Sequence, residues 1–387
     1  MAQKYHTIEV VKRGHLSLAF FALISVSAAE MPRYRFAEYV FPFAGSEIGS
    51  QVSGGNLNHH SIGDVIGKPG AYSKVTAPQR TIYSAWAVNE RLTQVSYRGT
   101  NGADFDGYIL DGQFNKASTK LPGNKSFDFA GGTADGTLMG AVSYDTTTQA
   151  GVLYNPITGY YQELNALRLN WVVSGNSKGQ YAVAVSDDIS QQPFFRTYRD
   201  ASGGFVFDSK TGQVTGGFEG MTPHLMAEDG TVYGAYSTSP FTWKPGLGIQ
   251  KIPFLGESGG LNTQMTEMYN VNSSGTVTGR FDWNKWDPET KSRGWDAFLV
   301  VNGKGVRFKD LQVDNMPSQY KVFQPWVFDN GEIFAWCLDK SDGQDLSKSR
   351  LIRLTPVPEP GTLVALALGT LGVLRRKKLA AERRKQD

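Results

Sequence analysis

The chain has 387 residues, of which 40% are apolar, 12% aromatic and 19% charged. This composition supplies enough apolar side chains for one large domain or two ordinary ones, and it excludes a disordered or collagen-like chain. The formal net charge of +3 resides at the ends, because residues 1–29 carry +2, residues 375–387 carry +5, and residues 30–374, with 29 bases and 33 acids, carry −4. We therefore predict that the body does not bind nucleic acid.

Residues 1–29 have the three parts of a secretory signal peptide. A mildly basic stretch ends at Lys12-Arg13, an apolar run extends over residues 16–26, and small residues follow up to Ala29. Eleven apolar residues are too few to cross a bilayer of roughly 30 Å. The segment predicts export through the Sec translocon, with cleavage after Ala29; cleavage after Ala28 fits almost as well.

The body, residues 30–355, contains a repeated unit. Each copy begins with a turn that ends in Gly, has an apolar residue two positions later and, in five of six copies, a small residue four positions later. The copies are residues 63–67, 136–140, 179–183, 230–234, 275–279 and 331–335, with a seventh, lacking the Gly, at 88–95. Alternation with period two indicates a strand, and a Gly inside a strand indicates close approach of another backbone.

Further strands follow each copy. Turn residues that tolerate positive φ separate two apolar strands at 111–112, 155–159, 208–212 and 302–303, and third strands are predicted at 161–164 and 306–311. Three or four strands in roughly 45 residues is the size of a propeller blade. We predict an all-β fold, a six- or seven-bladed β-propeller whose last blade is completed by residues 34–39. A β-sandwich with long loops is the alternative.

One unit also resembles a known repeat. Residues 241–246, 255–256 and 271–279 resemble the HAF extracellular repeat of bacterial exported proteins. The resemblance implies an architecture and no particular activity.

The C-terminal segment, residues 356–378, combines three features. Pro356, Pro358 and Pro360 predict an extended linker, residues 361–374 form an uncharged apolar run, and Arg375, Arg376, Lys377 and Lys378 follow it. The run predicts a short transmembrane helix with a basic membrane stop, which would leave residues 379–387 as a cytoplasmic tail.

This segment resembles the PEP-CTERM sorting signal of Gram-negative bacteria. The resemblance implies recognition of Pro358, Glu359 and Pro360 by an exosortase, a membrane-embedded processing enzyme that removes the helix and delivers the body to the cell surface or the exopolysaccharide matrix. The additional residues 379–387 depart from the usual pattern. A plain C-terminal membrane anchor is the alternative.

Few residue patterns in the body suggest catalysis or metal binding. Residues 256–260 match Gly-x-Ser-x-Gly with His59 or His60 upstream, but a loop of the repeat accounts better for them. Residues 101–107 contain an incomplete calcium-loop pattern, for which an Asx-rich hairpin turn is the better interpretation. The only cysteine, Cys337, is interpreted as a small buried hydrophobe. We predict no cofactor and no metal.

Trp283, Trp286 and Trp295 lie among acids and amides, a mixture that stacks on sugar rings and hydrogen-bonds hydroxyls. They are candidate glycan contacts, although packing within a blade is the favoured interpretation. The sequence thus predicts an exported, non-enzymatic surface or matrix protein that binds exopolysaccharide or a surface protein. The alternative is an exported polysaccharide hydrolase or lyase, with Asp104, Asp187 and Asp282 converging in one funnel.

Overall fold

The structure is a computed structural model of the whole chain. It describes residues 32–38, 52–56, 59–62, 65–68, 71–77, 80–100, 103–121, 126–143, 149–164, 170–185, 203–236, 239–254, 263–287, 292–339 and 350–357. The chain divides into two units. The smaller unit contains Met1–Arg35, Leu311–Asp314 and Pro356–Asp387, and the larger unit contains Phe36–Asp310 and Asn315–Thr355. The larger unit is called the propeller body below.

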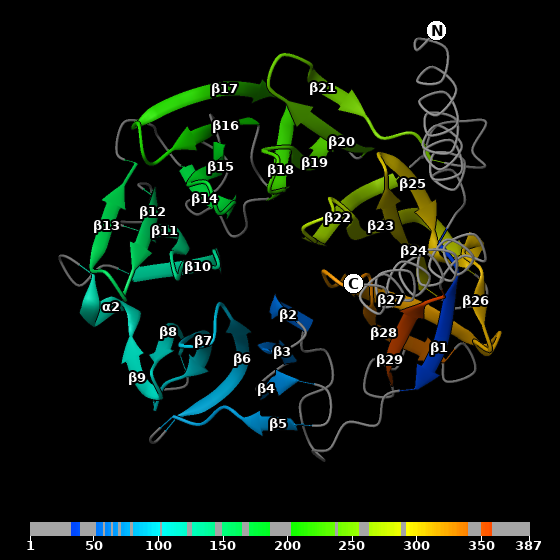
Figure 1. Cartoon of the computed structure of the whole chain (residues 1–387), viewed down its shortest axis with the longest axis horizontal. Coiled ribbons are helices and arrows are strands. Elements are labelled where there is room, and N and C mark those ends of the chain that lie inside the picture. The colour runs from blue at the N-terminus through cyan, green and yellow to red at the C-terminus, as the bar shows by residue number, and fades with distance from the viewer. Residues whose placement is uncertain are drawn as a thin grey trace, which may run out of the picture. The chain divides into compact units, whose positions relative to one another are not determined.

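The described strands of the propeller body form sheets arranged around a ring (Figure 1). Blade 1 contains β2 (Val52–Asn56), β3 (His59–Ile62), β4 (Val65–Lys68) and β5 (Ala71–Lys74), and blade 2 contains β6 (Thr81–Ala87), β7 (Leu92–Arg98), β8 (Asp104–Leu110) and β9 (Gln113–Lys116). Blade 3 contains β10 (Ser126–Gly132), β11 (Leu138–Ser143), β12 (Gln149–Asn155) and β13 (Tyr160–Glu163), and blade 4 contains β14 (Asn170–Gly175), β15 (Gln180–Val185), β16 (Gly203–Asp208) and β17 (Gln213–Glu219).

Blade 5 contains β18 (Met221–Met226), β19 (Val232–Tyr236), β20 (Ser239–Lys244) and β21 (Gly248–Lys251), and blade 6 contains β22 (Thr263–Val271), β23 (Val277–Asp287), β24 (Ser292–Val301) and β25 (Lys304–Arg307). The seventh sheet contains β27 (Tyr320–Val327), β28 (Ile333–Asp339) and β29 (Arg350–Pro356). Two short helices, α2 (Ala117–Lys120) and η4 (Phe308–Asp310), complete the described elements of the body. The prediction of an all-β propeller rather than a sandwich is confirmed.

The ring is closed by strands from both ends of the chain. Strand β1 (Tyr34–Glu38) lies beside β29, so the order in blade 7 is β1-β29-β28-β27. Arg350 of β29 forms an ion pair of 2.6 Å with Glu38 of β1. The prediction that an N-terminal strand completes the last blade is therefore confirmed. In the smaller unit, Tyr34 and Arg35 pair in parallel with β26 (Val313–Asp314).

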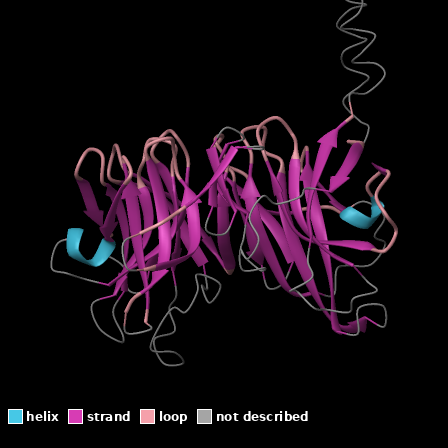
Figure 2. Ribbon diagram, turned by 90° about the horizontal axis from the view of Figure 1, so that it is seen from below, coloured by secondary structure: helices cyan, strands magenta, loops and turns pink. Residues whose placement is uncertain are grey.

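The repeated Gly of the sequence ends a β-turn between the first and second strands of a blade. In blades 3 to 7 the Gly N–H donates to the carbonyl three residues earlier, as Gly230 does to Ala227 (3.0 Å), and its φ is positive, +86° at Gly230. Positive φ is strained for residues with a Cβ, which explains the recurring Gly. Figure 2 shows most of the described turns gathered on one face of the body, called the turn face below.

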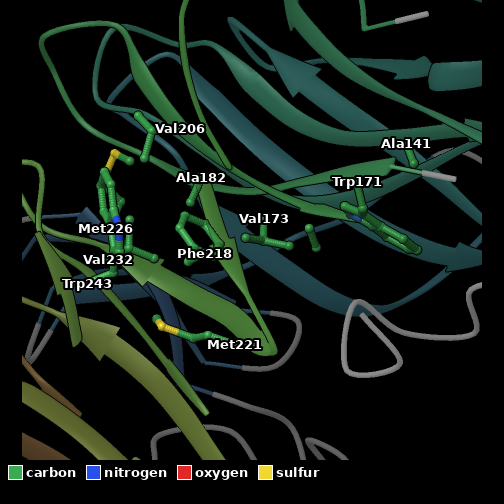
Figure 3. Packing of buried hydrophobic residues seen from close by; sticks show 11 residues of the cluster. Ala141, Trp171, Val173, Ala182, Val206, Phe218, Met221, Met226, Val232 and Trp243 are labelled. Atoms are coloured by element: carbon green, nitrogen blue, oxygen red, sulfur yellow. The ribbon is translucent and has the colours of Figure 1, made fainter. Parts of the chain in front are cut away.

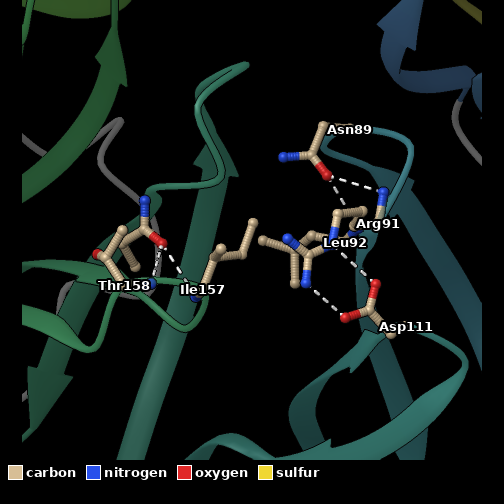
Figure 4. A network of polar contacts seen from close by, with 7 residues as sticks. Asn89, Arg91, Leu92, Asp111, Ile157 and Thr158 are labelled. Atoms are coloured by element: carbon tan, nitrogen blue, oxygen red, sulfur yellow. Dashed lines mark hydrogen bonds and ion pairs between the residues drawn. The ribbon is translucent and has the colours of Figure 1, made fainter.

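Blade 2 closes the same turn without Gly. The Oδ1 atom of Asn89 accepts hydrogen bonds from the N–H groups of Arg91 and Leu92, and Arg91 forms an ion pair with Asp111 (Figure 4). The side chain of Asn89 thus supplies the local acceptor that stabilises the turn. The hairpin turns predicted at 111–112 and 302–303 are also present, with Asp111 and Asn302 at positive φ. They follow the third strand of the blade rather than the second, as the predicted unit had it, because the unit lacked the inner strand.

The core lies between neighbouring sheets. One cluster joins Trp171 of β14 and Phe218 of β17 to Met221 of β18 and Trp243 of β20, all buried (Figure 3). Each large apolar side chain removed from water contributes roughly 1.5–3 kcal/mol. Cys337 of β28 is fully buried, and burial raises the pKa of its thiol well above the ordinary range. Its interpretation as a buried hydrophobe is confirmed.

Two local predictions were wrong. The strand expected at 306–311 ends at Arg307, and η4 follows it. Asp104 and Asp106 lie in strand β8 rather than in a turn, because the turn is closed earlier, where Gly99 N–H donates to Ala103 O (2.8 Å). Among the described residues, no helix is long and apolar enough to cross a membrane. The expected signal peptide and C-terminal helix lie outside the described residues.

Candidate functional site

The inner strands of the propeller body surround a cavity of about 760 Å³. Its described lining comes from blades 2 to 7, chiefly from β6, β10, β14, β18 and β22, and from the turns that follow these strands. These turns belong to the turn face, so the cavity opens where the repeated Gly turns gather. A central cavity formed by many short strands is a usual place for a ligand in a closed β-structure.

A β-bulge in each inner strand shapes the cavity wall. The register of β18 shifts between Pro223 and Leu225, which leaves His224 as the additional residue, and the register of β22 shifts at Tyr269 in the same way. Both side chains line the cavity. A bulge breaks the alternation of side chains and redirects one of them, and here it adds residues to the cavity wall.

In blades 3, 5 and 6 the small residue of the repeat, which is Gly140, Gly234 or Gly279, pairs with the residue just before the bulge. A Cβ atom on Gly234 of β19 would lie 2.1 Å from the carbonyl oxygen of Thr222, and one on Gly279 of β23 would lie 2.3 Å from that of Glu267. No side chain fits at these distances. The predicted close approach of another backbone is therefore confirmed, and it is the bulged inner strand that approaches.

Aromatic rings form much of the cavity wall. Trp86, Trp171, Tyr269 and Trp326 all line it, from four different blades. The rings of Trp86 and Trp326 are 5.8 Å apart at an interplanar angle of 81°. Exposed faces of indole and phenol rings stack on the C–H faces of sugars and attract cations.

Two titratable side chains are held in place within the wall. Glu267 is buried, lies 3.4 Å from the guanidinium of Arg280 and accepts a hydrogen bond of 3.1 Å from the Tyr269 hydroxyl. His224 accepts a hydrogen bond of 3.2 Å at Nδ1 from the N–H of Met268 in the next blade. In the neutral ring this bond places the proton on Nε2.

Carboxylates surround the cavity mouth. Glu90, Glu228 and Asp329 occupy the turns of three blades, are exposed and line the cavity. Two of them also join neighbouring turns, because Glu228 accepts hydrogen bonds from the N–H and hydroxyl of Ser177, and Asp329 accepts one of 2.7 Å from the N–H of Ser273. None of the described lining residues is Lys or Arg. The mouth is therefore negatively charged.

Two lining residues contain buried polar atoms without a hydrogen-bond partner. They are Oε1 of Gln94 on β7 and Nε1 of Trp171 on β14, in side chains that are only 8% and 7% exposed. A buried polar group without a partner costs about 1–3 kcal/mol, and such groups in a native protein are expected to have a reason. Both atoms have almost no accessible surface, so they lie behind the surface of the wall, out of reach of a ligand in the cavity.

The predicted glycan contacts lie elsewhere. Trp283 and Trp286 are in β23 and Trp295 is in β24, where it pairs with Asp282. The placement in strands agrees with the favoured interpretation, but these side chains lie outside the described ones. Strand β23 begins beside the turn face at Val277 and runs away from it, so these residues are at the end of the blade remote from the cavity mouth.

The other predicted site residues lie at least in part outside the described residues. Asp104 and Asp282 lie in strands β8 and β23, but their side chains are not among the described ones. Asp187, Ser258, Ala29, the motif Pro358-Glu359-Pro360 and the basic residues 375–378 lie outside the described residues. Asp106 accepts hydrogen bonds from the Ser96 hydroxyl and the Phe129 N–H. In the described ranges, no three His, Cys, Asp or Glu side chains are placed to hold a metal.

The comparisons with known proteins identify the C-terminal segment. The PEP-CTERM protein-sorting motif matches residues 356–378. A search of curated proteins finds no match to the sequence. The resemblance of the body to HAF repeats stays a prediction.

Solved structures similar to the chain include two propellers. One is the β-propeller domain of the Trilobed protease from Pyrococcus furiosus (10% identity, 72% of this chain, 85% of that chain, TM-score 0.42). Another is the Dos1 propeller (10% identity, 84% and 94%, TM-score 0.42). The chain thus carries a PEP-CTERM protein-sorting motif, at residues 356–378, behind a body that folds as a β-propeller.

Proposed function

We propose that the propeller body is a non-enzymatic, polysaccharide-binding module of an exported surface protein, and that the central cavity is its binding site. The cavity wall supports this proposal, because the partly exposed rings of Trp86 and Tyr269 lie among polar lining residues, which include Ser84, Ser96 and Asn270. Aromatic faces with a few hydrogen-bonding groups are the combination that binds sugars.

The state of the carboxylates favours binding over hydrolysis. Glycoside hydrolysis by the common mechanism needs one carboxyl group that can donate a proton. Glu267 is paired with Arg280, while Glu228 and Asp329 accept hydrogen bonds from backbone N–H groups. These contacts engage all three carboxylates with partners within the protein, which favours a role in shaping the cavity wall and its mouth over a role in cleaving a glycosidic bond.

The substitution Trp86→Leu tests the cavity. Leucine keeps an apolar side chain but removes the partly exposed indole face, so we expect weaker binding of polysaccharide fragments to the full-length protein. Tyr160 provides a control, because it is an exposed aromatic residue that does not line the cavity. Tyr160→Leu should leave binding intact.

The same binding assay tests the alternative binding site at Trp283 and Trp286. Trp283→Ala and Trp286→Ala should leave binding unchanged if the cavity is the site. Loss of binding in these variants with wild-type affinity in Trp86→Leu would place the site at the β23–β24 hairpin instead. Release of new reducing ends from bound polysaccharide would contradict the non-enzymatic proposal.

The processing of the chain is a separate part of the proposal. We expect cleavage after Ala29, recognition of Pro358-Glu359-Pro360 by an exosortase, and release of the body to the cell surface or the extracellular matrix. Cell fractionation with a tag on the body tests this. Alanine at all three motif positions should leave the intact chain in the inner membrane, whereas normal release of that variant would contradict exosortase processing.

A further inference from the structure

The charges of the cavity constrain its ligand further than its aromatic wall does. Of the four carboxylates among its described lining residues, Glu267 is compensated by Arg280, and Glu90, Glu228 and Asp329 are exposed at the mouth. No described lining residue is Lys or Arg. A polysaccharide of uronic acids would be repelled by three like charges, so a bound sugar chain has to be neutral or cationic.

The interior of the cavity distinguishes between cationic ligands. A lysine side chain that entered deeply would need a free carboxylate there, but Glu267 is already paired. The interior instead presents the partly exposed rings of Trp86 and Tyr269 and polar residues that include Ser84, Ser96 and Asn270. These groups match the C–H faces and hydroxyls of a sugar, while the carboxylates of the mouth match ammonium groups along the same chain.

We infer that the ligand is a cationic polysaccharide, a polymer of amino sugars with free amino groups. This inference rests on the proposed function and specifies its substrate class. The sugar rings stack on the aromatic wall, where protonated amines also gain from the ring faces. The amino groups that stay near the mouth face Glu90, Glu228 and Asp329.

The test compares tetrasaccharides that differ in charge. Full-length protein in detergent is titrated calorimetrically with a glucosamine tetrasaccharide, its fully N-acetylated form, tetralysine and a tetragalacturonate, at mildly acidic pH where the amines are protonated. We expect the glucosamine tetrasaccharide to bind about fivefold or more tighter than the N-acetylated form, with the difference shrinking in high salt.

Matched variants test whether the preference for free amino groups arises from the carboxylates at the cavity mouth. The double variant Glu90→Gln with Asp329→Asn removes two charges but keeps the shape of both side chains and the oxygen that accepts the hydrogen bond from Ser273 N–H. It should therefore abolish most of the preference for free amines. The control, Glu219→Gln with Asp310→Asn, removes two exposed charges from residues that do not line the cavity and should bind like the wild type.

The outcomes separate the two proposals. Equal affinity for both glucosamine forms would overturn the inference and leave the proposed function standing. Binding of neither form would overturn both. Tighter binding of tetralysine than of the glucosamine tetrasaccharide would overturn the inference in favour of a basic peptide.

Discussion

The indole rings of Trp86 and Trp326 meet edge to face, with ring centroids 5.8 Å apart, although their blades are separated around the ring by blade 1 (Figure 1). Trp326 is buried in a cluster with Phe328, Phe334 and Leu351, and Trp86 packs against this cluster. The pair thus connects the second blade to the last one through the cavity wall. The wall is a structural element as well as a surface for a ligand.

This contact predicts coupling between the two residues. Trp326→Ala should lower the free energy of unfolding by about 3–4 kcal/mol, because it empties a buried site of this size. A double-mutant cycle with Trp86→Ala should give a coupling energy of about 0.5–1.5 kcal/mol, the range for edge-to-face pairs. Denaturant unfolding measures both. Strictly additive effects would show that the rings do not stabilise each other.

The small residue four positions after the repeated Gly leads to a second prediction. Gly234→Ala should destabilise the protein by about 2 kcal/mol or more, because its Cβ would lie 2.1 Å from the backbone carbonyl of Thr222, which the β18–β19 pairing holds in place. Gly217→Ala is the control, since the nearest atom to its Cβ lies 3.7 Å away and the residue is exposed. That variant should stay within about 0.5 kcal/mol of the wild type. Equal effects in both variants would contradict the steric explanation.

The sequence predicts the second strand of each blade better than the first. Second strands follow a Gly turn and keep an uninterrupted alternation, as in residues 230–234, so their pattern is visible. Inner strands contain a bulge, which shifts the alternation at His224 and Tyr269 and hides the strand from a period-two search. The cavity residues therefore escaped prediction, although Glu228 and Asp329, two positions before the repeated Gly, could have been found from the repeat.

The aromatic part of the site was missed for a different reason. Trp86, Trp171 and Trp326 come from three blades far apart in the chain, so no local cluster marks them. Trp283 and Trp286 are close in sequence and therefore drew attention. Gln94 also had no signal, because nothing in the alternation of β7 shows that an amide is buried there at 8% exposure.

Asp106 predicts a specific pH dependence. Burial raises the pKa of this carboxyl group to about 6, with Ser96 and Phe129 as hydrogen-bond donors that oppose the rise. Because the pKa of Asp106 in the folded protein lies above the unfolded value near 4, the folded protein binds this proton more tightly than the unfolded chain does at pH values between the two. The contribution of Asp106 to stability is present below about pH 4 and is lost as the pH rises through about 6.

The measurement compares wild type with Asp106→Asn. The stability of wild type minus that of the variant should fall by about 2 kcal/mol between about pH 4 and pH 7. Asp111→Asn gives the opposite sign, because the hydrogen bond from Arg91 lowers the pKa of Asp111, so its contribution is lost as the pH falls. A difference for Asp106→Asn that does not vary with pH would show that the carboxyl group is not perturbed by burial.

Strand β1 closes the ring, so we expect its deletion to affect stability more than any other change near the N-terminus. Deleting residues 32–38 removes the neighbour of β29, a strand whose Leu351, Ile352 and Leu354 are buried, and leaves an unpaired sheet edge. We expect a lower unfolding midpoint and self-association, since a free edge pairs with other chains. Glu38→Gln is the control: it removes only the exposed ion pair with Arg350, which contributes about 0–1 kcal/mol. Thermal unfolding and size-exclusion chromatography at several protein concentrations distinguish the two variants. If the deletion behaved like Glu38→Gln, then β1 would lie beside β29 without holding the ring closed.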